Sequence, residues 1–372
     1  MKLSKPYHIK DFKFLLVLSV LALSIIGVLA VGSAEPSSQM KQIIGIIMGI
    51  IVMVIISMID YEWLLNLYWL IYGFNLLLLL YVHFFGMELN GAKRWINLFG
   101  FTTLQPSDFT KIFMILFFAK FLMNHEARMK EPLTIVKSVL LIAPSLLLIY
   151  KQPNLSNTLC IAALFCILMY IGGLSYKFIG TALAIAIPAA IIVVSIAVMP
   201  NQPFLKEYQQ KRILAWLEPE KYADDTAYQQ QNSIMAIGSG QLKGKGLNNN
   251  TTTSVKNGNF LLEADTDFIF AIIGEELGFV GCCIVIILLL LIVIQCILIG
   301  LLAQNLAGQI ICGGVAALIA IQSFINIGVA TGVLPNTGLS LPFVSAGLTS
   351  IVCFYMGIGF VLNVGLQPKK YQ

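Results

Sequence analysis

The acidic residues between 263 and 276 are the strongest candidates for catalysis. Glu263, Asp265 and Asp267 directly precede a very apolar segment, and Glu275 and Glu276 lie inside it. A helix N-terminus favours an acid through its dipole, which explains one or two of these residues without any chemistry. The dipole does not explain Glu275 and Glu276, because charge within an apolar span is costly. An acid at the edge of a low-dielectric groove, near like charges, acquires a raised pKa suited to a general base.

Basic residues suited to a phosphate group lie in two other segments. Lys93 and Arg94 precede a tryptophan, a combination that either binds a phosphate or lipid head group or anchors the chain at a membrane interface. The spacing alone favours the anchor. Lys243 and Lys245 lie among the glycines of 238–246, where close backbone approach and positive charge would suit a phosphate. The spacing is not that of a P-loop, and a flexible glycine loop is the alternative.

Two further features lie next to apolar segments. Asp108 and Lys111 are three residues apart, so on a helix they share a face and can pair. A lysine inside a membrane is costly unless it faces protein, water or a partner, although one near the end of a span can also snorkel to the surface. The segment 335–345 carries no charge and indicates a structured re-entrant turn.

The composition shows where such residues must be placed. Charged residues make up 11% of the 372 residues, against about 25% in soluble proteins. Apolar residues make up 58%, which excludes a soluble enzyme, a disordered protein and a nucleic-acid binder. The seven cysteines all lie in apolar runs without metal-ligand spacing, so we interpret them as small apolar residues and predict no metal site.

Ten segments approach the length of about 20 apolar residues that a membrane helix needs. They are 13–33, 42–59, 63–85, 108–124, 134–150, 156–173, 177–199, 268–302, 306–332 and 343–366. The short loops on the side of the N-terminus carry more Lys and Arg than the other short loops, which predicts N-in and C-in. The sequence therefore predicts an all-α polytopic membrane protein, with about ten transmembrane helices in one domain over 1–372. A long extracytoplasmic loop, about 200–266, is expected between helices seven and eight.

Four motifs, in order, resemble those of the SEDS family (shape, elongation, division and sporulation; RodA, FtsW and SpoVE). They are Gly-Ala-Lys-Arg-Trp with Gln-Pro-Ser-Asp in 91–108, the Tyr-Gln to Gly-Lys-Gly loop in 228–246, the Thr-Asp-Phe-Ile-Phe-Ala to Glu-Glu-Leu-Gly stretch in 266–278, and the Leu-Pro-x-Thr-Gly to Leu-Pro-Phe-Val-Ser turn in 332–345. The resemblance runs through all ten predicted spans and is slightly greater to RodA than to FtsW.

The resemblance implies a peptidoglycan glycosyltransferase. Such enzymes polymerise lipid II into glycan strands on the outer face of the bacterial cytoplasmic membrane, for cell-shape maintenance and elongation or for division, and release undecaprenyl diphosphate. It also implies a class B penicillin-binding protein as partner, and no nucleic acid. No cofactor is expected with certainty, and the sequence leaves open a divalent cation that accompanies the substrate diphosphate.

The resemblance also implies roles for single residues. Asp267 falls on the family's essential acid and is expected to act as a general base on the acceptor sugar hydroxyl. Asp108 and Lys111 match a structural or regulatory ion pair. The candidates for substrate binding, of which the basic ones would neutralise diphosphate, are Lys93, Arg94, Arg212, Gln229, Ser233, Lys243, Lys245, Glu263 and Ser345.

The sequence departs from the family pattern in four places, which indicates a diverged paralogue. Asn154 replaces an acid, Asp265 replaces a histidine, Asp108 replaces the longer Glu, and the segment 346–350 differs from the usual serine- and glycine-rich stretch. Two alternatives to the polymerase stay open, the first because a polar-lined bundle with embedded lysines also suits transport and the second because of Asn154 and the altered turn. One is a flippase or transporter of a lipid-linked precursor, and the other is a non-catalytic scaffold for a penicillin-binding protein.

Overall fold

The computed structural model describes residues 13–89, 92–98, 102–199, 207–222, 227–248, 261 and 263–367 as a helical membrane protein. Among these residues, seven helices are long and apolar enough to cross a membrane: α1 (Phe14–Ala34), α2 (Pro36–Met58), α4 (Tyr68–Phe85), α6 (Pro132–Lys151), α11 (Ile269–Leu301), α12 (Leu306–Ala330) and α13 (Leu348–Leu366). The other predicted spans are occupied by α5 (Pro106–Asn124), α7 (Leu155–Ile171) and α8 (Tyr176–Val198). A short 3₁₀ turn, Glu126–Arg128, connects α5 to α6.

Two predicted spans are shorter than expected. The segment 63–85 is divided, because a short helix α3 (Tyr61–Leu65) precedes α4. The Asp60 side chain accepts a hydrogen bond from the Glu62 amide and so caps α3. The last span begins at 348 rather than 343, because residues 343–347 belong to the preceding turn.

The purely helical expectation was wrong in one place, and the long loop is more ordered than predicted. Residues 87–104 form an antiparallel three-stranded sheet in the order β1 (Met87–Leu89), β2 (Ala92–Leu98), β3 (Thr102–Leu104). Strands β1 and β3 have only three residues each, and a bulge interrupts the alternation of β2, so the sequence shows no clear strand pattern. Within the predicted 200–266 loop, the chain forms α9 (Glu207–Leu217) and α10 (Tyr228–Ser239).

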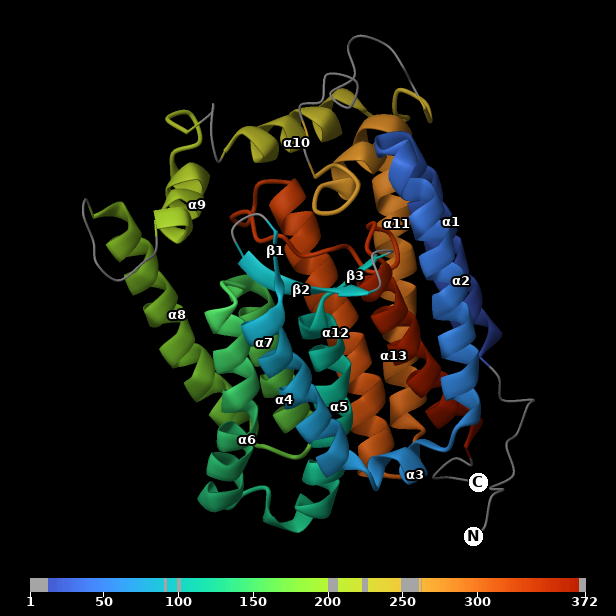
Figure 1. Cartoon of the computed structure of the whole chain (residues 1–372), viewed down its shortest axis with the longest axis vertical. Helices are drawn as coiled ribbons and strands as arrows, with labels where there is room; N and C mark the ends of the chain where they lie inside the picture. The colour runs from blue at the N-terminus through green and yellow to red at the C-terminus, as the bar shows by residue number, and fades with distance from the viewer. Residues whose placement is uncertain are drawn as a thin grey trace.

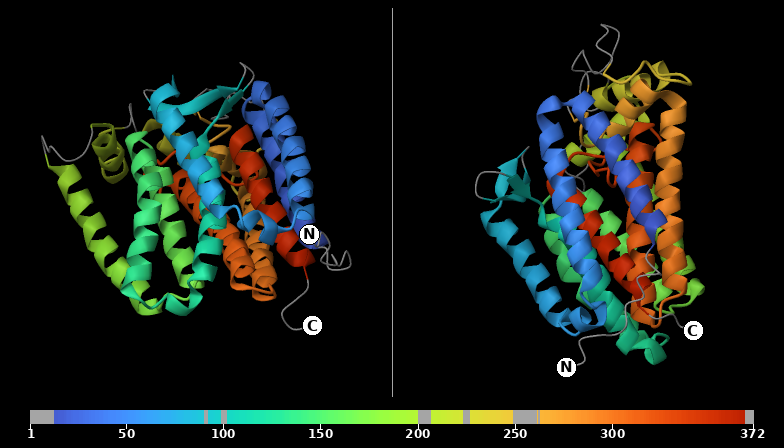
Figure 2. Two further views of the ribbon diagram at one scale, coloured as in Figure 1. Left: turned by 60° about the horizontal axis from the view of Figure 1, so that its bottom comes forward. Right: turned by 90° about the vertical axis from the view of Figure 1, so that its right-hand side faces the viewer.

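The helices form two groups with the sheet at one end. Figure 2 shows α4 and α6–α8 on one side of the molecule and α1, α2, α11 and α13 on the other. In Figure 1, α10 crosses one end of the bundle, and the sheet lies on the same side, at the upper ends of α4 and α5. At the opposite end, Lys13 lies close to Gly365, so α1 begins where α13 ends. The sheet and helix α10 therefore lie at the same end of the bundle.

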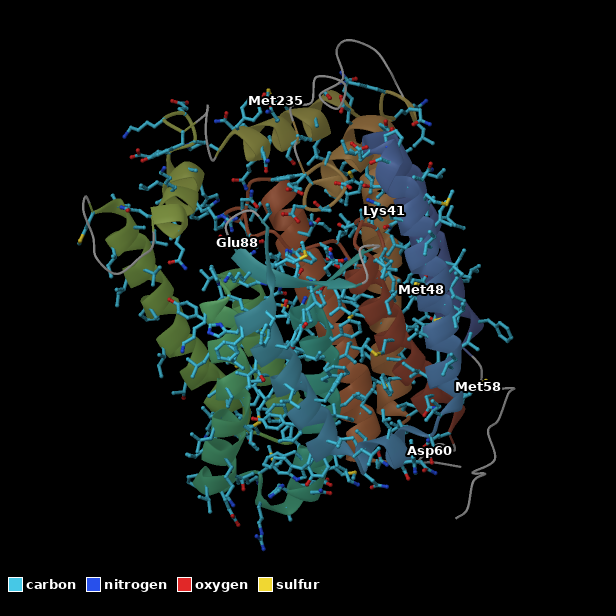
Figure 3. The ribbon with its side chains drawn as sticks, in the orientation of Figure 1. Lys41, Met48, Met58, Asp60, Glu88 and Met235 are labelled. Atoms are coloured by element: carbon cyan, nitrogen blue, oxygen red, sulfur yellow. The ribbon has the colours of Figure 1, made fainter. Side chains whose placement is uncertain are left out.

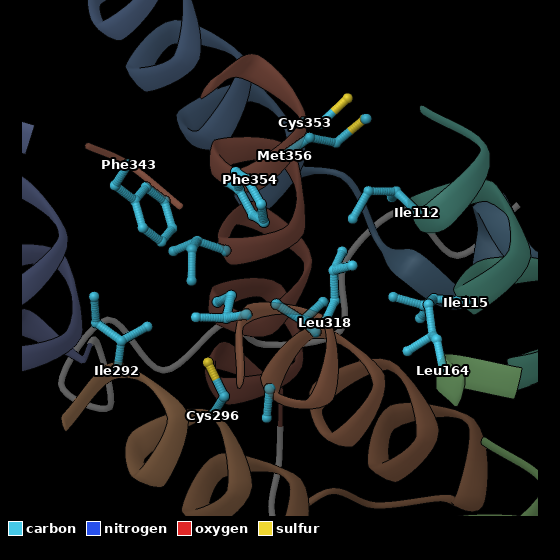
Figure 4. Close-up of a cluster of buried hydrophobic side chains, with 14 of the residues drawn as sticks. Ile112, Ile115, Leu164, Ile292, Cys296, Leu318, Phe343, Cys353, Phe354 and Met356 are labelled. Atoms are coloured by element: carbon cyan, nitrogen blue, oxygen red, sulfur yellow. The ribbon is translucent and has the colours of Figure 1, made fainter. Parts of the chain in front are cut away.

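The core lies where α5, α7, α11, α12 and α13 meet. Figure 4 shows Ile115, Leu164, Cys296, Leu318 and Phe354 converging from these five helices. All five side chains are buried. Because lipid is as apolar as leucine, close packing rather than apolarity holds such helices together.

Helices α2 and α13 show how close this packing is. A Cβ on Gly49 would lie 2.7 Å from the Tyr355 ring, and one on Gly359 would lie 2.9 Å from the Met53 carbonyl. The other face of α2 carries exposed apolar side chains, including Met48 and Met58 (Figure 3). Such a face suits a lipid environment.

A glycine-rich loop inserts into a kink of α11. Gly278 has φ +67°, which breaks the helix, and the loop after α10 bonds across the break. The Phe279 amide donates to the Gln241 carbonyl (2.8 Å) and the Lys245 amide donates to the Glu275 carbonyl (2.9 Å). A Cβ on Gly244 or Gly278 would lie within 2.3 Å of backbone atoms. The predicted flexible or phosphate-binding loop is therefore a backbone clamp that fixes α10 to α11.

Candidate active site

A polar cavity of about 420 Å³ opens at the end of the bundle that carries α10 and the sheet. Its walls come from β2, the first turns of α5 and α7, α9, α10, α12 and the segments 263–267 and 336–350. These elements are far apart in the sequence but all contribute polar side chains. The cavity therefore gathers half of the candidate residues that the sequence singles out.

Asp267 lies in this cavity, one residue before the N-cap of α11. Burial raises the pKa of Asp267 to about 7, and the nearby Glu263 and Asp265 add to the rise. Arg212 and Arg94 act in the opposite direction and lower it. A carboxyl group that ionises near neutral pH is suited to general-base catalysis.

The backbone around Asp267 is held by α12 and by the turn 335–347. The Asn326 amide group donates to the carbonyls of Asp267 (2.8 Å) and Leu339 (2.7 Å). The Ser345 hydroxyl donates to the Thr266 carbonyl (2.6 Å), and the Ala346 amide donates to the Asp265 carbonyl (2.8 Å). Ser345, expected to bind substrate, is buried outside the lining of the cavity and holds the segment that carries Asp267.

Arg94 and Arg212 bring positive charge to the cavity from two different elements. In the sheet, Met87 pairs with Trp95 and Glu88 pairs with Lys93, which leaves Arg94 as the extra residue of a bulge. The bulge breaks the alternation of the strand, so that Arg94 and Trp95 both line the cavity. Arg94 also donates to the carbonyls of Gln152 and Pro153 and so ties the sheet to the start of α7.

The other basic candidates do not line the cavity. Lys93 is exposed and lies opposite Glu88 in the sheet, and Lys243 is also exposed. Lys245 forms an ion pair with the buried Glu275, with 2.7 Å between Nζ and Oε1. This ion pair ties the loop after α10 to α11, and Lys245 does not line the cavity.

The three remaining substrate-binding candidates differ in their position. Gln229 and Glu263 line the cavity. Glu263 accepts a hydrogen bond from the Thr266 hydroxyl (3.0 Å) and lies close enough to raise the pKa of Asp267. Ser233 is fully buried on α10 and donates to the Ala330 carbonyl (2.7 Å), so it joins α10 to α12 and does not line the cavity.

Asp108 and Lys111 form an ion pair of 3.0 Å in the first turns of α5. Lys111 is 2% exposed, and its position inside the bundle satisfies the condition that an intramembrane lysine must have a partner. Asp108 also lines the cavity, so the pair lies directly beneath it.

Three cavity residues did not stand out as ligands in the sequence: Asn154, Asn157 and Gln322. Asn154 caps α7, because its side chain accepts from the Asn157 amide (3.3 Å). The sequence did hold one indication of the role of Gln322. In the largely apolar segment 306–332, Gln322 and Asn326 are four residues apart and therefore share one face of a helix. Over the described ranges, no three His, Cys, Asp or Glu side chains are grouped as metal ligands.

Comparison with known proteins gives one consistent result. The family model described as cell cycle protein, FtsW/RodA/SpoVE, matches residues 8–370. The chain is 31% identical over 368 residues to the peptidoglycan glycosyltransferase MrdB of Escherichia coli K12, covering 97% of this chain and 95% of that protein. It is 32% identical over 388 residues to the probable peptidoglycan glycosyltransferase FtsW of Trichlorobacter lovleyi, covering 99% and 96%.

Solved structures agree with this result. A chain of a peptidoglycan synthase complex, studied for its coordination of polymerization and crosslinking, superposes with a TM-score of 0.77 at 28% identity, covering 95% of this chain and 97% of that one. The rod shape determining protein RodA of Thermus thermophilus shares the fold, with a TM-score of 0.70 at 24% identity over 97% and 98% of the two chains. The match to the family model, together with the motifs that surround the cavity, shows that this chain belongs to the FtsW/RodA/SpoVE family, the SEDS proteins.

Proposed function

We propose that this protein is a peptidoglycan glycosyltransferase, which polymerises lipid II at the outer face of the cytoplasmic membrane. Relatives that match over nearly the whole chain carry this activity in their names. The observation that carries the proposal for this chain is Asp267, a carboxyl group with a pKa of about 7 in a cavity that Arg94 and Arg212 also line.

The proposed reaction uses Asp267 as the general base. Its carboxylate takes the proton of the acceptor sugar hydroxyl, and that oxygen forms a bond to the anomeric carbon of the donor sugar. The bond from the anomeric carbon to the diphosphate breaks, and the diphosphate leaves with the electron pair and its lipid. Negative charge that grows on the leaving diphosphate is stabilised by Arg94 and Arg212, whose guanidinium groups suit phosphate oxygens.

The position of the cavity supports the proposed topology. We assign α1, α2, α4–α8 and α11–α13 as ten transmembrane helices of one domain that spans the chain, with N-in and C-in. This orientation places α9, α10 and the sheet outside the membrane. The catalytic carboxyl group then lies where a lipid-linked substrate presents its diphosphate and sugars.

The proposed partner is a class B penicillin-binding protein that crosslinks the strands. The support is the similarity to a chain of a peptidoglycan synthase complex that combines polymerization with crosslinking. The proposal leaves the role in elongation or in division open, because MrdB and FtsW relatives match with similar identity.

The test is reconstitution of the chain with its transpeptidase partner in vesicles that contain labelled lipid II. We expect glycan strands that lengthen with time and depend on the chain. Movement of lipid II between leaflets without any polymer would contradict the proposal and support the flippase. A transpeptidase partner that is stimulated while no polymer forms would support the scaffold instead.

A further inference from the structure

The cavity has a second region, formed by the side chains of Asn154, Asn157 and Gln322, which we call the amide floor. The three side chains lie on α7 or at its N-cap and on α12, and all line the cavity. Their exposed fractions are 5%, 3% and 1%. Amide groups this deeply buried are costly unless their polar atoms are hydrogen-bonded.

Within the described part of the chain, each of these three amides has one polar atom without a hydrogen-bond partner: Asn154 Nδ2, Asn157 Oδ1 and Gln322 Oε1. Asn336 Oδ1 and Thr337 Oγ1, in the turn that forms another wall of the same cavity, are in the same condition. Unpartnered buried polar atoms are rare in folded proteins and call for an explanation. Five of the twelve such atoms among the described residues belong to this one cavity, where a bound ligand can supply the missing hydrogen bonds.

The hydrogen bonds that Asn154 and Asn157 already make determine which of their polar atoms remain for a ligand. Asn154 accepts from the Asn157 amide through Oδ1, so its Nδ2 is a free donor. Asn157 donates through Nδ2 to the Ser107 hydroxyl (3.4 Å), so its Oδ1 is a free acceptor. A ligand here must therefore both donate and accept, as hydroxyl and acetamido groups do, whereas a fully ionised phosphate only accepts.

The charged residues around the amide floor carry both signs. Asp108 lines the cavity beside these amides, and its partner Lys111 does not line it. The cations that line the cavity within the described residues are Arg94 and Arg212, on β2 and α9. Arg94 donates to the carbonyls of Gln152 and Pro153, next to Asn154, so the amide floor borders the cationic part of the cavity.

We propose that the amide floor is the subsite for a neutral acetamido sugar of the substrate, while Arg94 and Arg212 hold its diphosphate. This proposal rests on the proposed function and specifies which residues distinguish a sugar-bearing lipid from a bare lipid diphosphate. Asn154, which replaces an acid of the family pattern, is part of this floor, so the departure suits the binding of an uncharged group.

The test measures binding of two lipids to the purified full-length chain in nanodiscs: lipid II, and undecaprenyl diphosphate, which has no sugar. Gln322→Leu is the main variant, because no hydrogen bond of Gln322 within the protein is lost. We expect its affinity for lipid II to fall on the order of tenfold, the effect of one lost hydrogen bond to a buried partner, and its affinity for undecaprenyl diphosphate to stay unchanged. Arg212→Leu should weaken the binding of both lipids.

Two further variants make the outcome specific. Gln295→Leu is the matched control, since it makes the same chemical change in α11 away from the cavity, and both affinities should stay native. Gln322→Met repeats the test with an unbranched side chain if the Leu variant does not fold. Both Gln322 variants should keep or raise the melting temperature, because an unsatisfied buried polar group is removed.

Two results would overturn the proposal. In one, the Gln322 variants bind lipid II as tightly as the wild type. In the other, they lose affinity for both lipids equally, or melt earlier, which is the mark of a structural role. Because binding is measured without turnover, this result is independent of whether the chain polymerises lipid II.

Discussion

The environment of Asp267 determines how activity should depend on pH. Burial and neighbouring acids raise the pKa of this carboxyl group from 3.8 to about 7. A general base is active when deprotonated, so kcat/KM for polymerisation should rise with pH, with a midpoint near 7, and then level off. A polymerisation rate that is already constant from pH 5 upward would contradict the assignment.

Arg212 provides a direct check of that electrostatic account. Its positive charge lowers the pKa of Asp267, so removing the charge must raise it. We therefore expect Arg212→Gln to move the midpoint of the pH profile to a higher pH, in addition to weakening diphosphate binding. The midpoint of kcat/KM is the quantity to read, since the height of the profile changes with binding. A downward shift would mean that the two groups do not interact.

The positive charge of Lys245 does not by itself indicate which group it binds. Its place in a glycine-rich run favoured phosphate binding, but its ammonium group pairs with Glu275, which is 1% exposed. Removing one member of such a pair leaves an uncompensated buried charge, which costs on the order of 3 kcal/mol.

We therefore expect Lys245→Met to lower the melting temperature of the protein while the affinity of the folded fraction for lipid II stays native. The exposed Lys243→Met is the matched control and should melt like the wild type. Adding Glu275→Gln to Lys245→Met should restore part of the stability. If Lys245→Met instead weakens lipid binding at unchanged stability, the phosphate role is correct.

At the scale of elements, the contact between α10 and α11 depends on backbone proximity. A Cβ on Gly240 would lie 1.9 Å from the Gly274 carbonyl oxygen, whereas a Cβ on Gly238 would meet open space. Overpacking of this kind typically costs about 1–3 kcal/mol. Gly240→Ala should therefore lower the melting temperature and the polymerisation rate, because α10 carries Gln229 into the cavity.

Gly238→Ala is the control for that experiment. It lies in the last turns of α10, where alanine favours the helix by up to about 1 kcal/mol relative to glycine. Its stability and activity should equal or exceed those of the wild type. If Gly240→Ala and Gly238→Ala changed the melting temperature and the polymerisation rate equally, the close contact between Gly240 and Gly274 would not position α10.

The elements also show which parts of the fold a single sequence can predict. All ten predicted spans coincide with helices, because long apolar runs have few other solutions in a membrane. The sheet around Arg94 was not predicted, since its strands are short and its bulge interrupts their alternation. Gln322 was not identified either, because only the fold brings α12 to the start of α7 and so makes an isolated amide part of a cavity.

For the whole molecule, the proposed topology places α10 and the connection between α5 and α6 on opposite sides of the membrane. A membrane-impermeant maleimide applied to intact spheroplasts should label Lys243→Cys and not Lys130→Cys. Both should be labelled after lysis. The native Cys166, which is exposed on α7 and therefore faces lipid in this topology, should be replaced in the parent protein. Labelling of Lys130→Cys alone in intact spheroplasts would reverse the orientation.

The central claim is that Asp267 is the general base of lipid II polymerisation, and the rate of glycan formation by Asp267→Asn tests it most directly. The matched control is Asp265→Asn, the same change two residues away in a side chain that does not line the cavity. We predict that Asp267→Asn binds lipid II but elongates glycan about 10²–10⁴-fold more slowly than wild type, while Asp265→Asn stays close to the wild-type rate. Elongation by Asp267→Asn at the wild-type rate would contradict the claim.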